Sequence, residues 1–170
     1  MEMDYREASN QPARSFDRVV SVGLLEHIGH KNYHSFLELA HTLMKDDGIF
    51  VLHSIGGNRS TWTTDAWIDK YIFPNGHLPS IMQLGEAMEK LWVVEDWHNF
   101  GPDYEKTLLA WHANIEKSWD KLPQYDERFR RMWRYYLLSC AGGFRARRMQ
   151  LWQLVLTKPG RVGAYRRPVL

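Results

Sequence analysis

Apolar positions near the start of the chain follow two different periods. Two short, mostly apolar runs, 16–22 and 49–52, predict buried strands, and Gly23 ends the first of them. Between the runs, apolar residues recur at helical spacing behind a capping-box pattern formed by Ser35 and Glu38. A strand, a helix and a strand within about 35 residues predict a βαβ unit with parallel strands and a right-handed crossover.

Six further elements follow from the same reasoning. We expect short helices at 64–72 and 80–90, a strand at 91–96, longer helices at 104–119 and 125–140, and a last strand at 151–156. The stretch after His53 is rich in Gly, Ser, Thr and Asn and predicts a loop. Its Gly56-Gly57-Asn58 lacks the lysine of a phosphate-binding loop and indicates only a turn. No repeat or linker divides the chain, so 1–170 is expected to form a single α/β domain.

Composition excludes several classes of protein. The 170 residues are 44% hydrophobic and 25% charged, which is typical of a globular domain. A single cysteine excludes a disulfide framework and a zinc site built from cysteines. No apolar run approaches the roughly 18 residues of a membrane span, and residues 1–10 do not resemble a signal peptide. We therefore expect a cytoplasmic protein.

Charge is distributed unevenly along the chain. Residues 1–124 hold 11 Lys and Arg against 18 Asp and Glu, whereas residues 125–170 hold 11 against 2. The helix at 125–140 has an apolar face and an opposite face with four arginines, Arg128, Arg130, Arg131 and Arg134. The basic segment suggests contact with an anionic partner, either phosphate-bearing lipid or nucleic acid, or else a solvated helix face. The helix is compatible with one that lies on a membrane surface, and also with a core helix that has a charged solvent face. The 8 Trp, 8 Tyr and 7 Phe suit a deep apolar pocket, a membrane-facing surface or an aromatic core.

Two polar residues follow the two predicted parallel strands. Glu26 comes four residues after Val22, and His53 follows the second strand directly. Ligands of open parallel sheets bind beyond the carboxyl ends of the strands, so we expect these side chains to converge there. A glutamate and a histidine in that position can hold a small anion or water and manage a proton. Both residues also have an ordinary structural interpretation, as a loop carboxylate and a capping histidine.

Other reactive residue types favour chemistry less. His27, His30 and His34 have the spacing of one helix face, but Gly29 interrupts the helix and the order is not that of a zincin motif. A metal site there remains a minor alternative. Cys140 lies at helical spacing among apolar residues and indicates a core position, because a catalytic thiol needs an accessible, electropositive site.

Five long strings cover most of the chain: FDRVVSVGLLEHIGHKNY, GIFVLHSIGGN, WIDKYIFPNGHLPS, VEDWHNFGPDYEKTLLAW and YYLLSCAGGFRARRMQLWQLV. In this order they resemble the cyclopropane-fatty-acyl-phospholipid synthases, a family close to the mycolic acid cyclopropane synthases and related methyltransferases. The resemblance implies that S-adenosylmethionine gives a methyl group to a cis double bond of an unsaturated phospholipid acyl chain. The resulting carbocation loses a proton from the new methyl group and closes to a cyclopropane.

The resemblance also implies which residues act. A bound bicarbonate would be the general base, held by Glu26, His53, Tyr104 and a backbone group of Ile55. Tyr104 and Ile55 rest on the resemblance alone, whereas Glu26 and His53 also follow from their places after the strands.

The implied fold is the Rossmann-like fold of class I S-adenosylmethionine-dependent methyltransferases, with strand order 3-2-1-4-5-7-6. This chain matches strands 4-5-7-6 with inserted helices. Cofactor contacts are implied for Tyr5 and Arg6, in a segment that borders the adenine, and for Val22 and Gly23 at the switch point of the sheet.

No glycine-rich turn precedes Phe16, so the chain is expected to be the C-terminal portion of such an enzyme. We expect it alone to bind S-adenosylmethionine poorly and to self-associate through the bare edge of the strand at 16–22. Alternatively, an N-terminal partner chain would pair with that strand edge. The expected location is the inner face of the membrane, peripherally attached. An inactive remnant that only binds lipid surfaces, and plain methylation of the alkene, stay open as alternatives.

Overall fold

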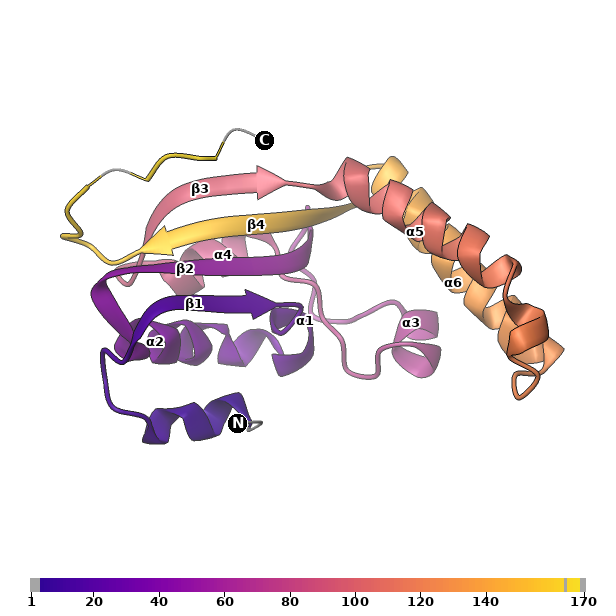
Figure 1. The fold of residues 1–170 in the computed structure, drawn as a ribbon, viewed down its shortest axis with the longest axis horizontal. Coiled ribbons are helices and arrows are strands. Elements are labelled where there is room, and N and C mark those ends of the chain that lie inside the picture. The colour runs from indigo at the N-terminus through magenta and orange to yellow at the C-terminus, as the bar shows by residue number, and fades with distance from the viewer. Residues whose placement is uncertain (1–3, 164, 169–170) are drawn as a thin grey trace.

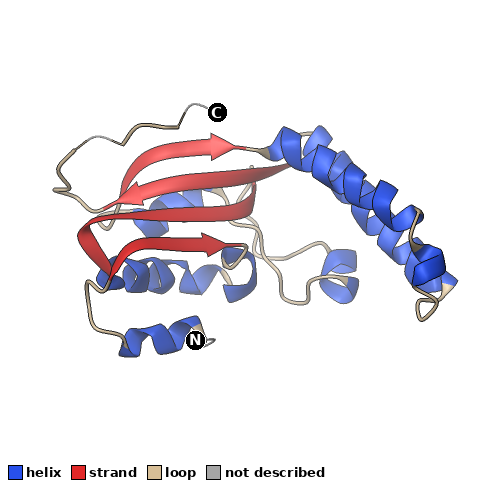
Figure 2. Ribbon diagram, viewed as in Figure 1, coloured by secondary structure: helices blue, strands red, loops and turns tan. Residues whose placement is uncertain are grey.

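The computed structural model describes residues 4–163 and 165–168, which fold into one mixed sheet with helices (Figure 1). In chain order the elements are η1 (Tyr5–Asn10), β1 (Phe16–Val22), α1 (Leu25–Ile28), η2 (His30–Asn32), α2 (Tyr33–Leu43), β2 (Met44–Gly57), α3 (Ala66–Tyr71), α4 (Ile81–Met88), β3 (Val93–Asn99), α5 (Gly101–Glu116), η3 (Trp119–Lys121), α6 (Glu127–Arg145) and β4 (Met149–Thr157). Figure 2 shows the strands side by side, with the α5–α6 hairpin projecting from one end of the sheet.

The sheet has the strand order β1-β2-β4-β3. β1 and β2 run parallel, with Val20 opposite Val51, and helix α2 connects them, which confirms the predicted βαβ unit. β4 lies antiparallel between β2 and β3. This spatial order is the one expected for strands 4-5-7-6 of a class I methyltransferase.

Two apolar clusters hold the elements together. Helices α2 and α4 cover one face of the sheet, where Phe50, Leu52, Leu154 and Leu156 are completely buried. The second cluster joins the hairpin to the end of β4 and is formed by Leu108, Leu137, Ala141, Phe144 and Leu151. At about 25 cal/mol per Å² of apolar surface, such burial is the main source of stability for both. In the described residues no helix is long and apolar enough to cross a membrane.

One strand is less covered than its sequence suggests. The run at 16–22 predicts a strand buried on both faces, but Val20 and Val22 are 65% and 68% exposed. β1 stands at the edge of the sheet, and within the described chain no element covers the face that carries these valines. The prediction of full burial is therefore wrong for β1, which offers an open edge and an open apolar face.

The predicted capping box is also wrong. Helix α2 begins at Tyr33, so Ser35 lies inside it, and the Ser35 hydroxyl donates to the carbonyl of Asn32 at 3.1 Å. The observed capping box belongs to α4. There the Gln83 amide donates to the Ser80 hydroxyl at 3.2 Å, and the Gln83 side chain accepts from the Ser80 amide at 2.9 Å.

The second strand is longer than predicted. The sequence indicates a strand at 49–52 and a turn at Gly56-Gly57, but β2 continues through both glycines, which pair with β4. The reason lies across the sheet. A Cβ atom on Gly56 would come within 2.0 Å of the Trp152 ring, so the glycine lets the indole pack flat against the strand.

Candidate functional site

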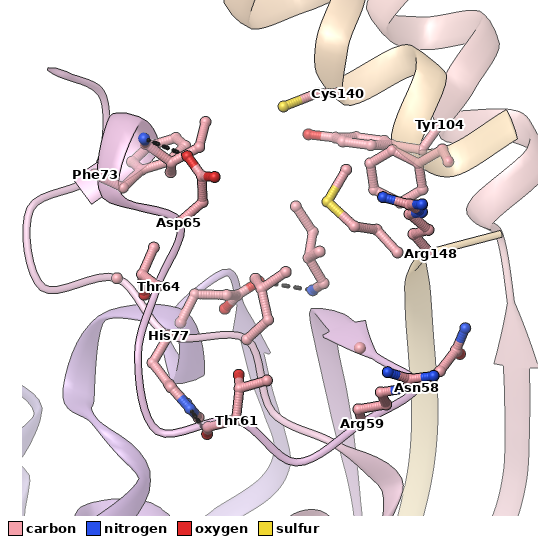
Figure 3. A pocket seen from close by; sticks show the side chains of 18 of the residues that line it. Asn58, Arg59, Thr61, Thr64, Asp65, Phe73, His77, Tyr104, Cys140 and Arg148 are labelled. Carbon is pink, nitrogen blue, oxygen red and sulfur yellow. Dashed lines mark hydrogen bonds between the residues drawn. The ribbon is translucent and has the colours of Figure 1, made fainter. Parts of the chain in front are cut away.

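A cavity of about 940 Å³ lies where the carboxyl ends of β1 and β2 face the α5–α6 hairpin. Its walls come from α1, the end of β2, the segment from 58 to 78 that contains α3, and both helices of the hairpin (Figure 3). This is the place at which parallel α/β sheets bind ligands, and its size is that of a small-molecule site.

Glu26 lies on α1 and is 8% exposed. The chain reaches this position because Gly23 adopts a left-handed conformation (φ 65°) that turns it sharply after β1. One carboxylate oxygen, Oε1, accepts a hydrogen bond of 2.7 Å from the Ile55 amide. The other, Oε2, is buried and has no hydrogen-bond partner among the described residues. A buried acceptor of this kind is costly, so Oε2 points to a ligand that can donate a hydrogen.

A second hydrogen bond fixes Glu26 from its main chain. The Glu26 carbonyl accepts from the His77 amide at 2.8 Å. His77 is itself buried, with Nδ1 at 3.1 Å from the Tyr33 hydroxyl and Nε2 hydrogen-bonded to the Thr61 carbonyl. Burial, and to a lesser degree the charge of Glu26, raises the pKa of Tyr33. Sequence reasoning missed His77, because its partner Tyr33 lies 44 residues away and no local pattern marks the pair.

Tyr104 faces the cavity from α5 (Figure 3). Its ring packs edge-on against Phe144 and Trp111, at centroid distances of 5.1 and 5.8 Å. Burial, with smaller contributions from Cys140 and Glu26, raises the pKa of the Tyr104 phenol. The hydroxyl therefore stays protonated at neutral pH and can donate a hydrogen bond.

Cys140 lines the same wall from α6 (Figure 3). Burial raises the pKa of its thiol to about 11, and Asp65 adds to this effect. A thiol with this pKa is almost fully protonated at neutral pH and is a weak nucleophile. The cysteine packs with the second apolar cluster, as expected from its place in the sequence, although it also faces the cavity.

The structure brings four of the predicted site residues to one cavity: Gly23, Glu26, Ile55 and Tyr104. His53 is not among the residues that line it. It lies two positions before Ile55 on the half-exposed side of β2, and its carbonyl accepts from the Gly23 amide at 3.0 Å. His53 and Ile55 share one side of β2, and the hydrogen bonds from Gly23 to His53 and from Ile55 to Glu26 join the ends of the two strands.

Three residues expected to contact the cofactor also lie outside the cavity. Val22 points from the exposed face of β1. Tyr5 packs against Phe36 at a centroid distance of 5.5 Å, and the Arg6 guanidinium pairs with Asp4 at 2.6 Å on the surface. Of the four residues predicted to contact the cofactor, Gly23 alone lines the cavity. Apart from the two residues next to it, no described residue has an atom within 4 Å of the place where its Cβ would be, so the turn leaves open space beside the end of β1.

The three histidines considered for a metal site have separate neighbours. The His27 ring faces Phe73 at 5.7 Å, the His30 ring lies 4.7 Å from Trp62, and His34 Nδ1 is 3.2 Å from the Ala87 carbonyl. Across the described ranges, no three or more His, Cys, Asp or Glu side chains gather in a geometry that could hold a metal ion.

Comparison with protein families decides where the chain belongs. Residues 1–154 match the family described as mycolic acid cyclopropane synthetase. The chain is a member of this family. Among curated proteins it is 49% identical, over 156 residues, to the cyclopropane-fatty-acyl-phospholipid synthase of Escherichia coli (strain K12). That match covers 91% of this chain and 40% of the relative, so the chain spans two fifths of the relative's length.

Solved structures agree with this membership. The chain resembles the cyclopropane synthase MmaA2 from Mycobacterium tuberculosis, with a TM-score of 0.78 and 26% identity over 88% of this chain and 58% of that one. It resembles the mycolic acid cyclopropane synthase CmaA1 complexed with SAH and CTAB equally well, with a TM-score of 0.77 and 30% identity at the same coverage. This synthetase-family chain therefore has the expected fold of class I S-adenosylmethionine-dependent methyltransferases, and its relatives are such enzymes.

Proposed function

We propose that this chain supplies the acyl-chain side of a cyclopropane-fatty-acyl-phospholipid synthase. The reaction transfers a methylene group from S-adenosylmethionine to the cis double bond of an unsaturated phospholipid acyl chain. The observation that carries the proposal is the unpartnered Oε2 of buried Glu26 in a cavity that Tyr104 and other large apolar side chains also line. A protein that only bound lipid surfaces through an exposed helix would need neither the buried carboxylate nor the aromatic cavity wall.

The walls suit the substrate. Ile55, Leu108 and Phe144 offer carbon surface to an acyl chain, and Tyr104 and Tyr136 add aromatic rings. When the double bond is alkylated, positive charge develops on the chain carbons, and aromatic faces stabilise such charge. A largely apolar wall also excludes the water that would capture the cation.

Proton removal is the step for which the polar groups are suited. Bicarbonate, when bound, supplies a proton acceptor beside the acyl chain. Oε2 of Glu26 fits its hydroxyl, because this oxygen needs a donor, and the neutral Tyr104 phenol fits its negative oxygens. The Ile55 amide donates to Oε1 and so holds the carboxylate in position. For His53 the proposal rests on the family resemblance and on its place two residues before Ile55, on the same side of β2.

S-adenosylmethionine supplies the methyl carbon. We propose that it lies beside Gly23, with further contacts from Tyr5, Arg6 and Val22. The open edge and open face of β1 are where another segment would add to this site, either an N-terminal partner chain or a second copy of this one. Because the acyl chains belong to a bilayer, we further propose that the cytoplasmic protein attaches peripherally to the inner face of the membrane.

The test is methyl transfer to vesicles of unsaturated phosphatidylglycerol, with isotopically labelled S-adenosylmethionine. The purified chain is assayed alone and together with a separately produced segment of the E. coli relative that lies outside the match. We expect little cofactor binding by calorimetry and little product with the chain alone, and labelled product with the segment present. Proton NMR of the product distinguishes a cyclopropane ring from a methyl branch.

Two results would contradict the proposal. A methyl branch in place of the ring would show the sister reaction. Vesicle binding without any transfer, although the added segment binds cofactor, would favour the lipid-surface module instead.

A further inference from the structure

Three arginines share one side of the cavity. Arg59 follows β2, and Arg147 and Arg148 follow α6, so segments far apart in the sequence bring them together. Figure 3 shows Arg59 beside Asn58 and Arg148 near Tyr104, away from the side that carries Asp65. All three are exposed, which places them at the mouth of the cavity and not at its inner end.

These arginines differ from two paired arginines of the hairpin. Arg134 pairs with Glu116 at 2.8 Å, and Arg145 pairs with Glu105 at 2.6 Å. Within the described part of the chain, none of the three cavity arginines has a carboxylate partner. Three positive side chains without counter-charges at one mouth attract an anion, and guanidinium groups match the geometry of phosphate oxygens.

The turn that carries Arg147 and Arg148 is fixed by an amide network. Arg147 is held in the left-handed conformation (φ 58°), and its carbonyl accepts from Asn58 Nδ2 at 2.6 Å and from Gln150 Nε2 at 2.9 Å. Gln150 is buried, and its Oε1 accepts from Asn99 Nδ2 at 2.7 Å. Side chains from the ends of three strands thus anchor this turn. The backbone from which Arg147 and Arg148 project is therefore fixed before any ligand arrives, which lowers part of the entropic cost of binding.

We propose that Arg59, Arg147 and Arg148 form a subsite for the phosphodiester of a phospholipid, with one acyl chain of the same molecule running inward toward Glu26 and Tyr104. The inference deepens the proposed function and rests on it. An anion alone would satisfy the arginines and leave the apolar cavity unfilled, and a neutral chain would do the reverse. A phospholipid has both parts at a spacing that its own glycerol backbone provides.

The probe is dihexanoylphosphatidylglycerol below its critical micelle concentration, so that no membrane surface contributes. Calorimetry compares the complete chain with a cavity triple variant, Arg59→Gln, Arg147→Gln and Arg148→Gln. The matched control removes the same charge elsewhere, through Arg128→Gln, Arg131→Gln and Arg166→Gln, three exposed arginines outside the cavity. We expect the cavity triple to lose about tenfold or more in affinity and the control to lose less than about twofold.

Equal losses in the two triples would indicate only a general field of positive charge and would overturn the inference, as would an unchanged cavity triple. Inorganic phosphate and deacylated glycerophosphoglycerol form the second arm. Either one binding as tightly as the lipid would make this a free phosphate site. Circular dichroism checks folding, and the single variants Arg59→Gln and Arg148→Gln, each expected to lose part of the affinity, keep the test decisive if the triple unfolds.

The binding assay contains no cofactor and requires no turnover, so the two proposals can fail separately. Arginine-dependent lipid binding without methyl transfer, when the added segment is present and binds cofactor, would overturn the proposed function. Methyl transfer that is insensitive to the cavity triple would overturn the phosphodiester subsite.

Discussion

The sheet side and the hairpin side of the cavity are held in place by different interactions. On the sheet side, two hydrogen bonds hold Glu26, one of 2.7 Å from the Ile55 amide and one of 2.8 Å from the His77 amide. On the hairpin side, Tyr104 is held by ring contacts, such as the edge-on contact of 5.1 Å with Phe144. Hydrogen bonds are directional, whereas apolar packing depends mainly on the area that is covered.

This difference suits the two parts of the proposed reaction. A proton must move between atoms at hydrogen-bond distance, so the groups that handle it need fixed positions. An acyl chain is flexible and has no polar atoms to align, so its wall needs contact area and little precision. The sheet side is therefore expected to tolerate few changes, and the hairpin side to tolerate more.

The largest expected effect comes from Glu26→Gln. Glutamine keeps an oxygen that can accept from the Ile55 amide, but it replaces the unpartnered oxygen with a donor. We expect methyl transfer to fall by about 100-fold or more, while the melting temperature stays the same or rises, because a buried charge has been removed. Glu38→Gln, an exposed change on α2, is the control for both measurements. A melting temperature that falls together with activity would show that Glu26 is mainly structural.

Local patterns account for part of this contrast. Around Gly23 the spacing of apolar residues changes from that of a strand to that of a helix. This change predicts β1, α2 and β2, and with them the place of Glu26 after the first strand. Tyr104 was expected from the family strings, and the structure brings it to the same cavity as Glu26. These features depend on spacing over a few residues, which a sequence states directly.

Other features depend on contacts between distant segments. No local sequence pattern marks the hydrogen bond between His77 and Tyr33. The same holds for the hydrogen bond between Gln150 and Asn58, which lie 92 residues apart. The side on which His53 lies depends on the whole sheet, and so does the close approach of Trp152 to Gly56. For this reason the sequence predicted a turn at the glycines, where the structure has a continuous strand.

Cys140 tests how closed the hairpin side is. Burial raises the pKa of its thiol to about 11, against an ordinary value of 9.0. Because the thiolate is the reactive form, alkylation near pH 8 should be about 100-fold slower than for an ordinary thiol and should rise about tenfold per pH unit. The chain has one cysteine, so the same chain unfolded in urea is the control and should react at the ordinary rate. A folded chain with a midpoint near 9.0 would mean that the wall is open to solvent.

Glycine-to-alanine changes test how well the sheet side and the hairpin side of the cavity tolerate an added methyl group, measured as the free energy of unfolding. In Gly56→Ala the new methyl group would overlap the buried Trp152 ring, and we expect a loss of about 1–3 kcal/mol in the free energy of unfolding. Gly57→Ala is the matched control on the same strand, with its nearest contact at an ordinary 3.7 Å. On the hairpin, Gly142→Ala meets no atom within 4 Å and should stabilise α6 by up to about 1 kcal/mol. Urea unfolding measures all three, and losses of similar size would contradict the contrast.

The smallest effect concerns the tie between the two helices of the hairpin. Arg134 donates to Glu116 at 2.8 and 3.1 Å and lowers the pKa of that carboxyl below its ordinary value of 4.5. A carboxyl whose pKa is lower in the folded state adds stability above its ordinary pKa, and this stability is lost as the pH falls through the folded value. The pair is partly exposed, so Glu116→Gln should cost less than about 1 kcal/mol at neutral pH and progressively less below pH 4.5. In an Arg134→Gln background the cost should disappear. A cost that is the same at every pH, or that persists without Arg134, would show that Glu116 stabilises the hairpin by packing and not by charge.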